Sequence, residues 1–441
     1  MKKRALVLFT LLLFILSGVV LQVYRLSDAY LSQAADQQGS VTVKVANSRG
    51  TIYDARLRPL TNAGEEYRLS VTPSPEAIAA LSGMLDEEQL AAVSERLQSG
   101  KPAVVTLPEI PANLEGSLLF KVPVRYGGRL LAPHLLGYMD GDGLHGLTGV
   151  ELAFEDYLRG RNGRRIVETN TAGKVTGEIY SVEPEPGNTV ALTLDIDFQE
   201  DVERILAETV ESMTAEDDID RGAAAAVVQV GTGEVLSLAS YPTYSLSTFR
   251  ENISELSNDS MRPMWNRATQ GKYAPGSTLR PLTAIAALES GATTVREKIY
   301  DSGKWVYPGY SASYTYCWKR SGHGALNVRG AIMNSCNYYF AEMGYRMGMD
   351  TLRKYYADFG LGAPTGIEIG DTAGRLPSQN EGENLAPWAA FGQANQEYSP
   401  LQLANYIATL CGGGDRYATH LLKNVRSSGS GALEYVYDAE P

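Results

Sequence analysis

Ser277 stands in a setting where a hydroxyl side chain could do chemistry. It follows a turn-forming Pro-Gly pair at residues 275–276 and begins an apolar helical pattern. A serine hydroxyl in the first turn of a helix lies near a positively polarised helix end and becomes a nucleophile when a base takes its proton. The alternative is an ordinary N-cap, because serine after a turn starts many helices. The local sequence leaves both interpretations open.

A second polar cluster lies well downstream, in the sequence MNSCNYYF at residues 333–340. Ser335 and Asn337 supply a hydroxyl and an amide two positions apart. The alternative is a buried polar cluster on a helix or loop, in which these groups bond only to nearby backbone. Neither segment defines a function by itself.

Together and in this order, the two segments resemble the active-site motifs of class B penicillin-binding proteins. That family carries an SxxK tetrad within the phrase PGSTxKP, then an SxN triad, then a KTG strand. This chain has PGSTLRP at residues 275–281 and SCN at residues 335–337. The similarity extends over about residues 49–425 and includes RGTIYD at 49–54, GLTGVE at 146–151, LRG at 158–160, CW at 317–318, GHG at 322–324, FGLG at 359–362, FGQ at 391–393 and SPLQ at 399–402.

The resemblance implies acyl transfer from the peptide stems of the cell wall. Ser277 matches the nucleophile that attacks the penultimate D-alanyl carbonyl, after which an amine on a neighbouring stem receives the acyl group. Ser335 and Asn337 match the SxN residues, which would relay a proton and hold the substrate amide. The backbone N–H of Ser277 would form half of the oxyanion hole.

Arg280 departs from the family pattern, because it stands where the family has the tetrad lysine. A serine nucleophile needs an adjacent base, and the family supplies this lysine one helical turn further along. The pKa of arginine stays above about 12, whereas burial can bring the pKa of a lysine down towards neutrality. Arg280 could still polarise Ser277 or bind a carboxylate through its planar fork. Lys272 precedes the turn and does not match the motif as a replacement base.

The third motif is also missing, since no KTG or KSG follows Lys423 before the sequence stops at Pro441. In the family, that strand supplies the second oxyanion N–H and the side chains that bind a carboxylate. Its loss would leave an unpaired sheet edge, which folded proteins avoid. We therefore expect a transpeptidase domain that is incomplete at its C-terminus.

The N-terminus predicts a membrane anchor. Three basic residues precede an apolar run at residues 5–23, which is long enough to cross a bilayer. By the positive-inside bias, residues 1–4 form a cytoplasmic tail, residues 5–24 a transmembrane helix, and the rest is extracytoplasmic, as in a single-pass protein of the cell membrane. A cleaved signal peptide is the alternative, although its apolar core would be shorter.

The net charge of -12 argues against a nucleic-acid partner, because phosphate binding needs a basic surface.

The spacing of cysteines and histidines indicates no metal site. Cys317, Cys336 and Cys411 lack metal-ligand spacing and are too few for a disulfide framework. The four histidines form no paired motif such as HExxH. We predict neither a metal nor an organic cofactor, and we interpret Cys336 as a packing residue.

The hydrophobic patterns predict two domains and an α+β fold. Residues 25–187 have β-like stretches at 41–45 and 67–71 and a helical pattern at 86–97, and we expect a β-rich, dimerisation-like pedestal there. Residues 188–441 form the expected transpeptidase domain, an antiparallel sheet flanked by helices. Its predicted elements are a strand at 189–194, a helix at 195–213, a hairpin with strands at 223–230 and 234–240, and helices at 282–288, 328–333, 352–359 and 401–410.

The predicted function is peptidoglycan cross-linking by a serine-type D,D-transpeptidase. D-Ala-D-Ala stem peptides would be its substrates, β-lactams its inhibitors, and a cell-wall synthase or a division or elongation protein its partner. The alternative is a catalytically inactive relative that acts as a scaffold or binds stems or β-lactams, for which Arg280 is the main support. A soluble hydrolase of the β-lactamase type is disfavoured by the expected anchor and pedestal.

Overall fold

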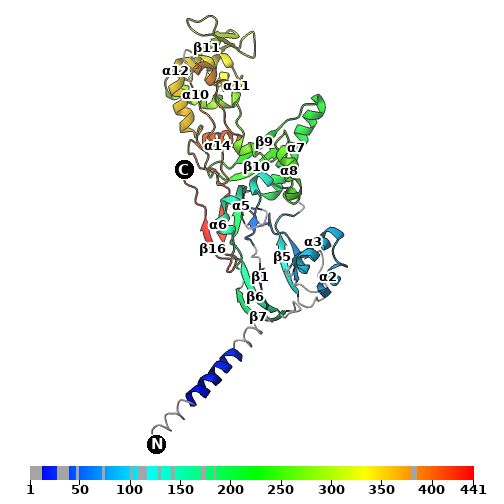
Figure 1. Cartoon of the computed structure of the whole chain (residues 1–441). Helices are drawn as coiled ribbons and strands as arrows, with labels where there is room; N and C mark the ends of the chain where they lie inside the picture. The colour runs from blue at the N-terminus through cyan, green and yellow to red at the C-terminus, as the bar shows by residue number, and fades with distance from the viewer. Residues whose placement is uncertain are drawn as a thin grey trace, which may run out of the picture. The chain divides into compact units, whose positions relative to one another are not determined.

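The computed structural model of the chain describes residues 12–26, 39–45, 49–71, 75–99, 103–107, 117–127, 131–140, 145–169, 175–182, 185–378 and 385–441. The chain forms two compact units, each assembled from three separate segments (Figure 1). Unit 1 comprises Met1–Arg49, Asn62–Arg125 and Gly160–Gly187, and unit 2 comprises Gly50–Thr61, Tyr126–Arg159 and Asn188–Pro441.

The described part of unit 1 contains two antiparallel sheets, with strand orders β1-β6-β7 and β4-β3-β5. Its elements are a helix at residues 12–26, β1 (Gly39–Val45), β3 (Gly64–Val71), α2 (Pro75–Leu81), α3 (Glu87–Gln98), β4 (Ala103–Leu107), β5 (Ser117–Val124), β6 (Gly163–Thr169) and β7 (Val175–Val182). Within the described residues, no helix is both long and apolar enough to cross a membrane. Residues 5–11 of the expected transmembrane segment lie outside the described part of the chain.

Apolar side chains of α2, α3, β3 and β4 form a hydrophobic core in the described part of unit 1. Strand β4 alternates buried and exposed residues, as expected for a sheet with one face on the core. Helix α3 buries Val93 and Leu97, which lie four residues apart on one helix face. Asp86 caps this helix by accepting a hydrogen bond from the Gln89 amide at 2.8 Å. The predicted helix at 86–97 is therefore confirmed, with its first residue acting as the cap.

Unit 2 carries the Ser277 and Ser335 segments on a larger set of elements. They are β2 (Ile52–Tyr53), α4 (Pro133–Leu136), α5 (Gly149–Ala153), α6 (Glu155–Leu158), β8 (Thr189–Leu192), α7 (Ile196–Asp217), β9 (Ala223–Val228), β10 (Val235–Tyr241), α8 (Phe249–Asn258), α9 (Arg267–Gln270), η1 (Gly276–Leu279), α10 (Arg280–Glu289), β11 (Ile299–Asp301), β12 (Lys304–Val306), β13 (Tyr314–Tyr316), β14 (Gly324–Leu326), α11 (Val328–Met333), α12 (Asn337–Asp358), α13 (Ala386–Ala389), α14 (Pro400–Cys411), β15 (Leu422–Arg426) and β16 (Leu433–Val436). These strands and helices confirm the α+β class.

The expected antiparallel sheet is only partly correct for unit 2. Strands β9 and β10 form the predicted antiparallel hairpin. The sheet β16-β15-β8-β2, by contrast, ends in a parallel pair, because β2 lies beside β8 in the same direction. Strand β2 is only two residues long and comes from a distant segment, so no hydrophobic repeat could have indicated its partner.

Helix α7 packs on the β9–β10 hairpin through a buried glutamine. Gln199 has no exposed surface, and its amide donates to the carbonyl of Leu238 at 2.6 Å. Its oxygen accepts from the Ser237 hydroxyl at 2.7 Å and from the Leu238 amide at 3.0 Å. A buried amide is tolerated only when its polar atoms are paired, as they are here. The predicted helix at 195–213 is confirmed, with Asp195 as its N-cap.

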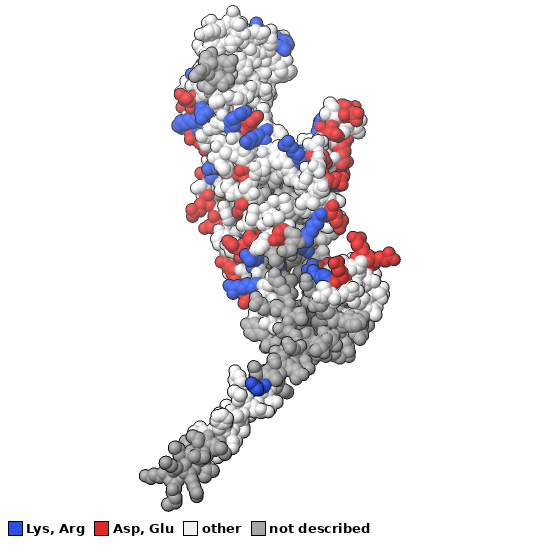
Figure 2. Space-filling view, in the orientation of Figure 1, with Lys and Arg blue, Asp and Glu red and all other residues white. Residues whose placement is uncertain are grey.

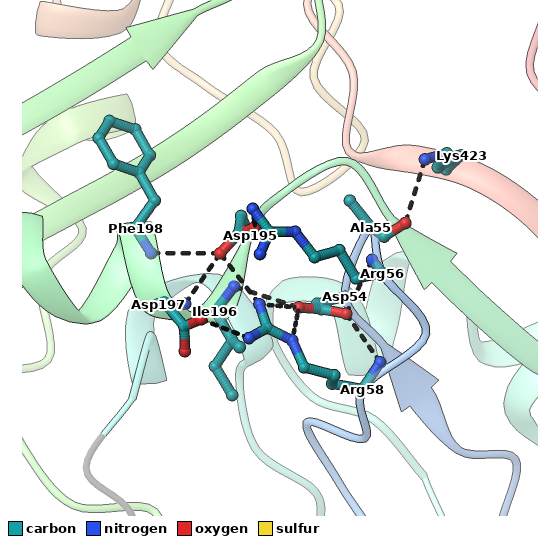
Figure 3. Close-up of polar contacts among 9 residues, drawn as sticks. All are labelled: Asp54, Ala55, Arg56, Arg58, Asp195, Ile196, Asp197, Phe198 and Lys423. Carbon is teal, nitrogen blue, oxygen red and sulfur yellow. Dashed lines mark hydrogen bonds and ion pairs between the residues drawn. The ribbon is translucent and has the colours of Figure 1, made fainter.

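The RGTIYD phrase ends in an ion-pair cluster at the start of α7 (Figure 3). Asp54 is fully buried and accepts hydrogen bonds from the amides of Arg56 and Arg58 at 2.9 and 2.8 Å. The Arg58 guanidinium contacts the carboxylates of Asp54, Asp195 and Asp197 at 2.8, 2.9 and 2.5 Å. Since Asp195 caps α7, the cluster joins the turn after β2 to the first turn of that helix.

Both central carboxylates of this cluster are held in their charged form. Burial by itself would raise the pKa of Asp54, but hydrogen bonds from Arg58 and from the amide of Ile196 outweigh it and lower the pKa below its usual value. Burial likewise opposes ionisation of Asp195, and hydrogen bonds from the Phe198 amide and Arg58 lower its pKa. The cluster is therefore stable at neutral pH and weakens in acid.

Candidate active site

Ser277 is exposed in the short helix η1, which passes directly into α10. Gly276 before it has a φ of 54°, in the left-handed region that glycine adopts without a steric cost. The Gly276 amide donates to the carbonyl of Gly392 at 3.1 Å. A Cβ at Gly392 would lie 2.2 Å from the Gly276 oxygen. The FGQ phrase at residues 391–393 therefore supports the turn that presents Ser277.

The two motif segments, distant in sequence, meet at this turn. The Ser335 hydroxyl donates to Oγ of Ser277 at 3.2 Å. Ser335 lies between α11 and α12 with a φ of 48°, which costs a non-glycine residue about 1–2 kcal/mol and is often found at functional sites. Asn337 begins α12 and donates from Nδ2 to the carbonyl of Tyr316 at 3.0 Å.

Arg280 lies one helical turn after Ser277 and points into the protein. It is only 4% exposed, and Nη2 donates to Oδ1 of Asn337 at 2.5 Å. Its guanidinium also lies 5.4 Å from the centre of the Phe340 ring. Nε and Nη1 are buried and find no hydrogen-bond partner among the described residues. Burial lowers the pKa of Arg280 from its ordinary value, yet an arginine remains protonated. Arg280 is thus a fixed cation in this site and cannot serve as a base.

A cluster suited to a metal ion lies directly behind the SxN segment. The ligand atoms of Asp301, Cys317, His323 and Cys336 all lie within 4.8 Å of one another. Nδ1 of His323 is 2.8 Å from the Asp301 carboxylate, and the two sulfurs are 3.9 Å apart. Tetrahedral Zn²⁺ with Zn–S bonds of about 2.3 Å requires a sulfur–sulfur distance of about 3.8 Å. Two sulfurs, one imidazole and one carboxylate are a donor set that Zn²⁺ prefers.

The spacing of cysteines and histidines in the sequence did not indicate this cluster, because its members come from separate elements. Asp301 ends β11, Cys317 follows β13, His323 precedes β14, and Cys336 caps α12. Three residues in the family phrases could have indicated a metal site. They are Cys317 in CW, His323 in GHG and Cys336 inside the SxN triad. Burial raises the pKa of the Cys336 thiol, so without a metal this residue would stay protonated.

Comparison with known protein families supports the family resemblance. Residues 223–440 match the family model of the penicillin binding protein transpeptidase domain. Residues 130–192 match that of the penicillin-binding protein dimerisation domain.

Several curated proteins and solved structures resemble the chain. The peptidoglycan D,D-transpeptidase MrdA of Escherichia coli K12 is 30% identical over 505 residues, which cover 100% of this chain and 76% of that protein. The stage V sporulation protein D of Bacillus subtilis is 31% identical over 295 residues, which cover 66% of this chain and 43% of that protein. The chain therefore belongs to the class B penicillin-binding proteins.

Solved structures agree with this assignment at the level of the fold. A structure described as "Structural coordination of polymerization and crosslinking by a peptidoglycan synthase complex" has a TM-score of 0.68 and 26% identity, covering 100% of this chain and 81% of the other. The penicillin-binding protein PBP2 of Helicobacter pylori, solved in complex with MreC, has a TM-score of 0.69 and 20% identity, covering 91% and 81% of the two chains.

Proposed function

We propose that this chain cross-links peptidoglycan as a serine D,D-transpeptidase, with Ser277 as the nucleophile. The observation that carries the proposal is the 3.2 Å hydrogen bond between the hydroxyls of Ser335 and Ser277. It joins the two motifs that the family uses for acyl transfer, and Ser277 is the exposed member at the tip of a supported turn.

The residues would act in the following order. Oγ of Ser277 attacks the penultimate D-alanyl carbonyl, and its proton passes by way of Ser335 to the departing D-alanine amine. An amine of a second stem then attacks the acyl-enzyme and restores the Ser277 hydroxyl. Asn337 would hold the substrate amide, but its side chain already bonds to Arg280 and to the Tyr316 carbonyl. These contacts use one N–H of Nδ2 and one lone pair of Oδ1, so the second N–H and the second lone pair are left for a substrate amide.

Arg280 makes slow acylation the expected behaviour. A positioned general base contributes typically about 10²–10⁴-fold to a rate, and the guanidinium provides no basic lone pair. The second candidate function, an inactive relative that binds stems or acts as a scaffold, is favoured by this same residue. In that case the hydrogen bond between Arg280 and Asn337 would stabilise the site without contributing to a reaction.

Intact mass distinguishes the two functions. The full-length protein is incubated with benzylpenicillin, and the Ser277→Ala variant serves as the control. Active-site acylation predicts a mass increase of one penicillin that is slow and absent from Ser277→Ala. If wild type gains no adduct under saturating penicillin for hours, the transpeptidase proposal is wrong and the scaffold function takes its place.

The location and partners of the chain are also part of the proposal. The expected transmembrane helix at residues 5–24 would anchor the chain in the cell membrane as a single-pass protein, with residues 25–187 as the pedestal and residues 188–441 as the extracytoplasmic transpeptidase domain. A cell-wall synthesis partner is supported by the structural neighbours, one of which was solved with MreC and another within a synthase complex. Crosslinking of the membrane-embedded protein followed by identification of attached proteins tests both points.

The cluster behind the SxN segment would hold Zn²⁺ with Asp301, Cys317, His323 and Cys336 as its four ligands. Four protein ligands leave no open position, so the ion would have a structural role. Because Cys336 lies between Ser335 and Asn337, a metal–sulfur bond there would hold both motif residues in place.

A further inference from the structure

An exposed pair of tyrosines lies on the hairpin beside the candidate active site. Strands β12 and β13 pair antiparallel, with Lys304 opposite Tyr316. Tyr314 and Tyr316 are two residues apart and therefore lie on one face of β13. Their side chains are 43% and 40% exposed, and their ring centres are 5.4 Å apart. Exposed apolar side chains that lie together mark binding sites more often than those scattered singly.

Two cations hold these rings in place. Nζ of Lys304 lies 4.0 Å from the centre of the Tyr314 ring, and the Arg320 guanidinium lies 4.0 Å from the centre of the Tyr316 ring. Both cations are exposed, and in the described part of the chain neither has a carboxylate within ion-pair distance. We call Lys304, Tyr314, Tyr316 and Arg320 the tyrosine platform. Cation–π contacts order the rings and leave both charges available to an anion.

The platform lies in a basic region of an acidic protein. The chain as a whole has a net charge of -12. Residues 296–329 reverse this sign, since their basic residues are Arg296, Lys298, Lys304, Lys319, Arg320 and Arg329, and their acidic residues are only Glu297 and Asp301. Glu297 is paired with Arg346 at 2.7 Å, and Asp301 is buried. On the face drawn in Figure 2, acidic side chains gather over α7, whereas the end of unit 2 around β11 is mostly white, with small blue areas at its edge. This region therefore complements a negatively charged partner.

The platform is joined directly to the SxN segment. The carbonyl of Tyr316 accepts the hydrogen bond from Nδ2 of Asn337 at 3.0 Å. Two residues further on, the Trp318 indole donates to the carbonyl of Asn334 at 2.9 Å. A ligand on the platform would thus bind to the strand whose backbone holds the Asn337 side chain of the SxN segment.

We propose that the tyrosine platform binds the glycan strand of peptidoglycan, resting sugar rings on the tyrosines and placing carboxylates of the attached stems against Lys304 and Arg320. This inference rests on the proposed transpeptidase function, which requires a substrate whose stems are attached to a glycan. Sugar rings have apolar C–H faces that pack on aromatic rings, and the stems supply the negative charge that the basic region lacks. The platform would then select polymeric glycan over free peptide.

Binding to defined glycan fragments tests the proposal on the full-length protein in detergent. The probes are purified peptidoglycan glycan chains that carry their stems, the same chains after enzymatic removal of the stems, and the free stem pentapeptide. The double variant Tyr314→Ala/Tyr316→Ala removes the rings, and Tyr314→Phe/Tyr316→Phe keeps their faces. Tyr300→Ala is the matched control, since Tyr300 is 70% exposed on β11 and is not part of the platform.

The rings account for binding if the alanine double variant weakens the affinity for both glycan probes by about tenfold or more, as truncated aromatic hot spots do. The phenylalanine variant and Tyr300→Ala should bind as wild type does. Lys304→Gln/Arg320→Gln should weaken only the stem-bearing chains, and more strongly at low salt. Equal glycan binding by wild type and the alanine variant would overturn the proposal.

Penicillin acylation of Ser277, measured in parallel, separates the two proposals. If wild type is acylated but the alanine variant binds glycan normally, only the platform inference fails. If wild type is not acylated, the transpeptidase function fails, whatever the glycan affinities are. A variant that loses penicillin acylation to the same extent as glycan binding would show a disturbed active site and would likewise overturn the platform's specific role.

Discussion

Arg280 donates from Nη2 to Oδ1 of Asn337 at 2.5 Å, so the residue at the motif lysine position contacts the second motif. Within the described residues, no side-chain hydrogen bond joins the guanidinium to Ser277. The remaining nitrogens Nε and Nη1 are buried without partners there. An incompletely paired buried cation is costly, and this one lies where the reaction needs a base.

Arg280→Lys should speed penicillin acylation of Ser277. A buried lysine can lose its proton near neutral pH, whereas arginine cannot. We expect an increase of about 100-fold, which is the lower end of the range for general-base catalysis. The rate is measured by fluorescent-penicillin labelling as a function of pH. Arg280→Gln is the control, because it removes the charge without adding a base and should give no increase. A lysine variant no faster than the glutamine variant would show that the lost base does not limit this site.

Gly392→Ala should displace the turn that presents Ser277. Its new Cβ would lie 2.2 Å from the backbone oxygen of Gly276, at a φ of 78°. We expect acylation to fall more than about tenfold, because even small misplacements of a reacting group cost this much. Gly370→Ala is the matched control, since Gly370 also has a φ of 78° but nothing within 4 Å of the added Cβ. It carries the same backbone strain without the clash. Similar losses in both variants would refute the supporting role of Gly392.

Zinc content should be about one ion per chain and should depend on the cysteines behind the SxN segment. Elemental analysis after dialysis measures the content, and differential scanning calorimetry measures the effect of a chelator. We expect Cys336→Ser to weaken zinc affinity by more than about tenfold and chelation to lower the melting temperature. Cys411→Ser is the control, because Cys411 is an exposed free cysteine outside the cluster. If the dialysed protein contains no zinc and the chelator leaves its melting temperature unchanged, the cluster does not bind a structural zinc ion.

Acid should destabilise unit 2 through the cluster around Arg58. The pKa values of Asp54 and Asp195 are lowered in the folded protein, so their contribution is complete above the unfolded pKa of about 4. It is then lost as the pH falls through the folded values. Asp54→Asn should lower the free energy of unfolding at pH 7 by about 1–3 kcal/mol. It should also flatten the acid dependence between about pH 5 and 2.

Urea unfolding measured across that pH range checks this expectation. Asp197→Asn is the control, since the Asp197 side chain is 59% exposed and a surface ion pair contributes only about 0–1 kcal/mol. If Asp54→Asn keeps the full acid dependence of wild type, other carboxylates are responsible.

Local signals in the sequence were sufficient for most of the secondary structure. Each of these signals acts over a few residues. Examples are the hydrophobic period of α3, the capping residues Asp86 and Asp195, and the glycines between β9 and β10. Short-range geometry of this kind is encoded by neighbouring side chains. The family was likewise recognisable from the order and spacing of the PGST and SxN phrases, and the replacement of the motif lysine by Arg280 was readable directly.

Only the tertiary structure decided which of these residues touch. The bond between Arg280 and Asn337, the candidate metal site that includes Cys336 and the tyrosine platform each join side chains from separate elements. The parallel pairing of β2 with β8 depends on the same long-range packing. The distances between these side chains depend on how helices and strands pack against one another. Packing of this kind is cooperative, and no local sequence pattern specifies it. The sequence thus determined the family and the motif residues, and packing decided their charge environment and their contacts.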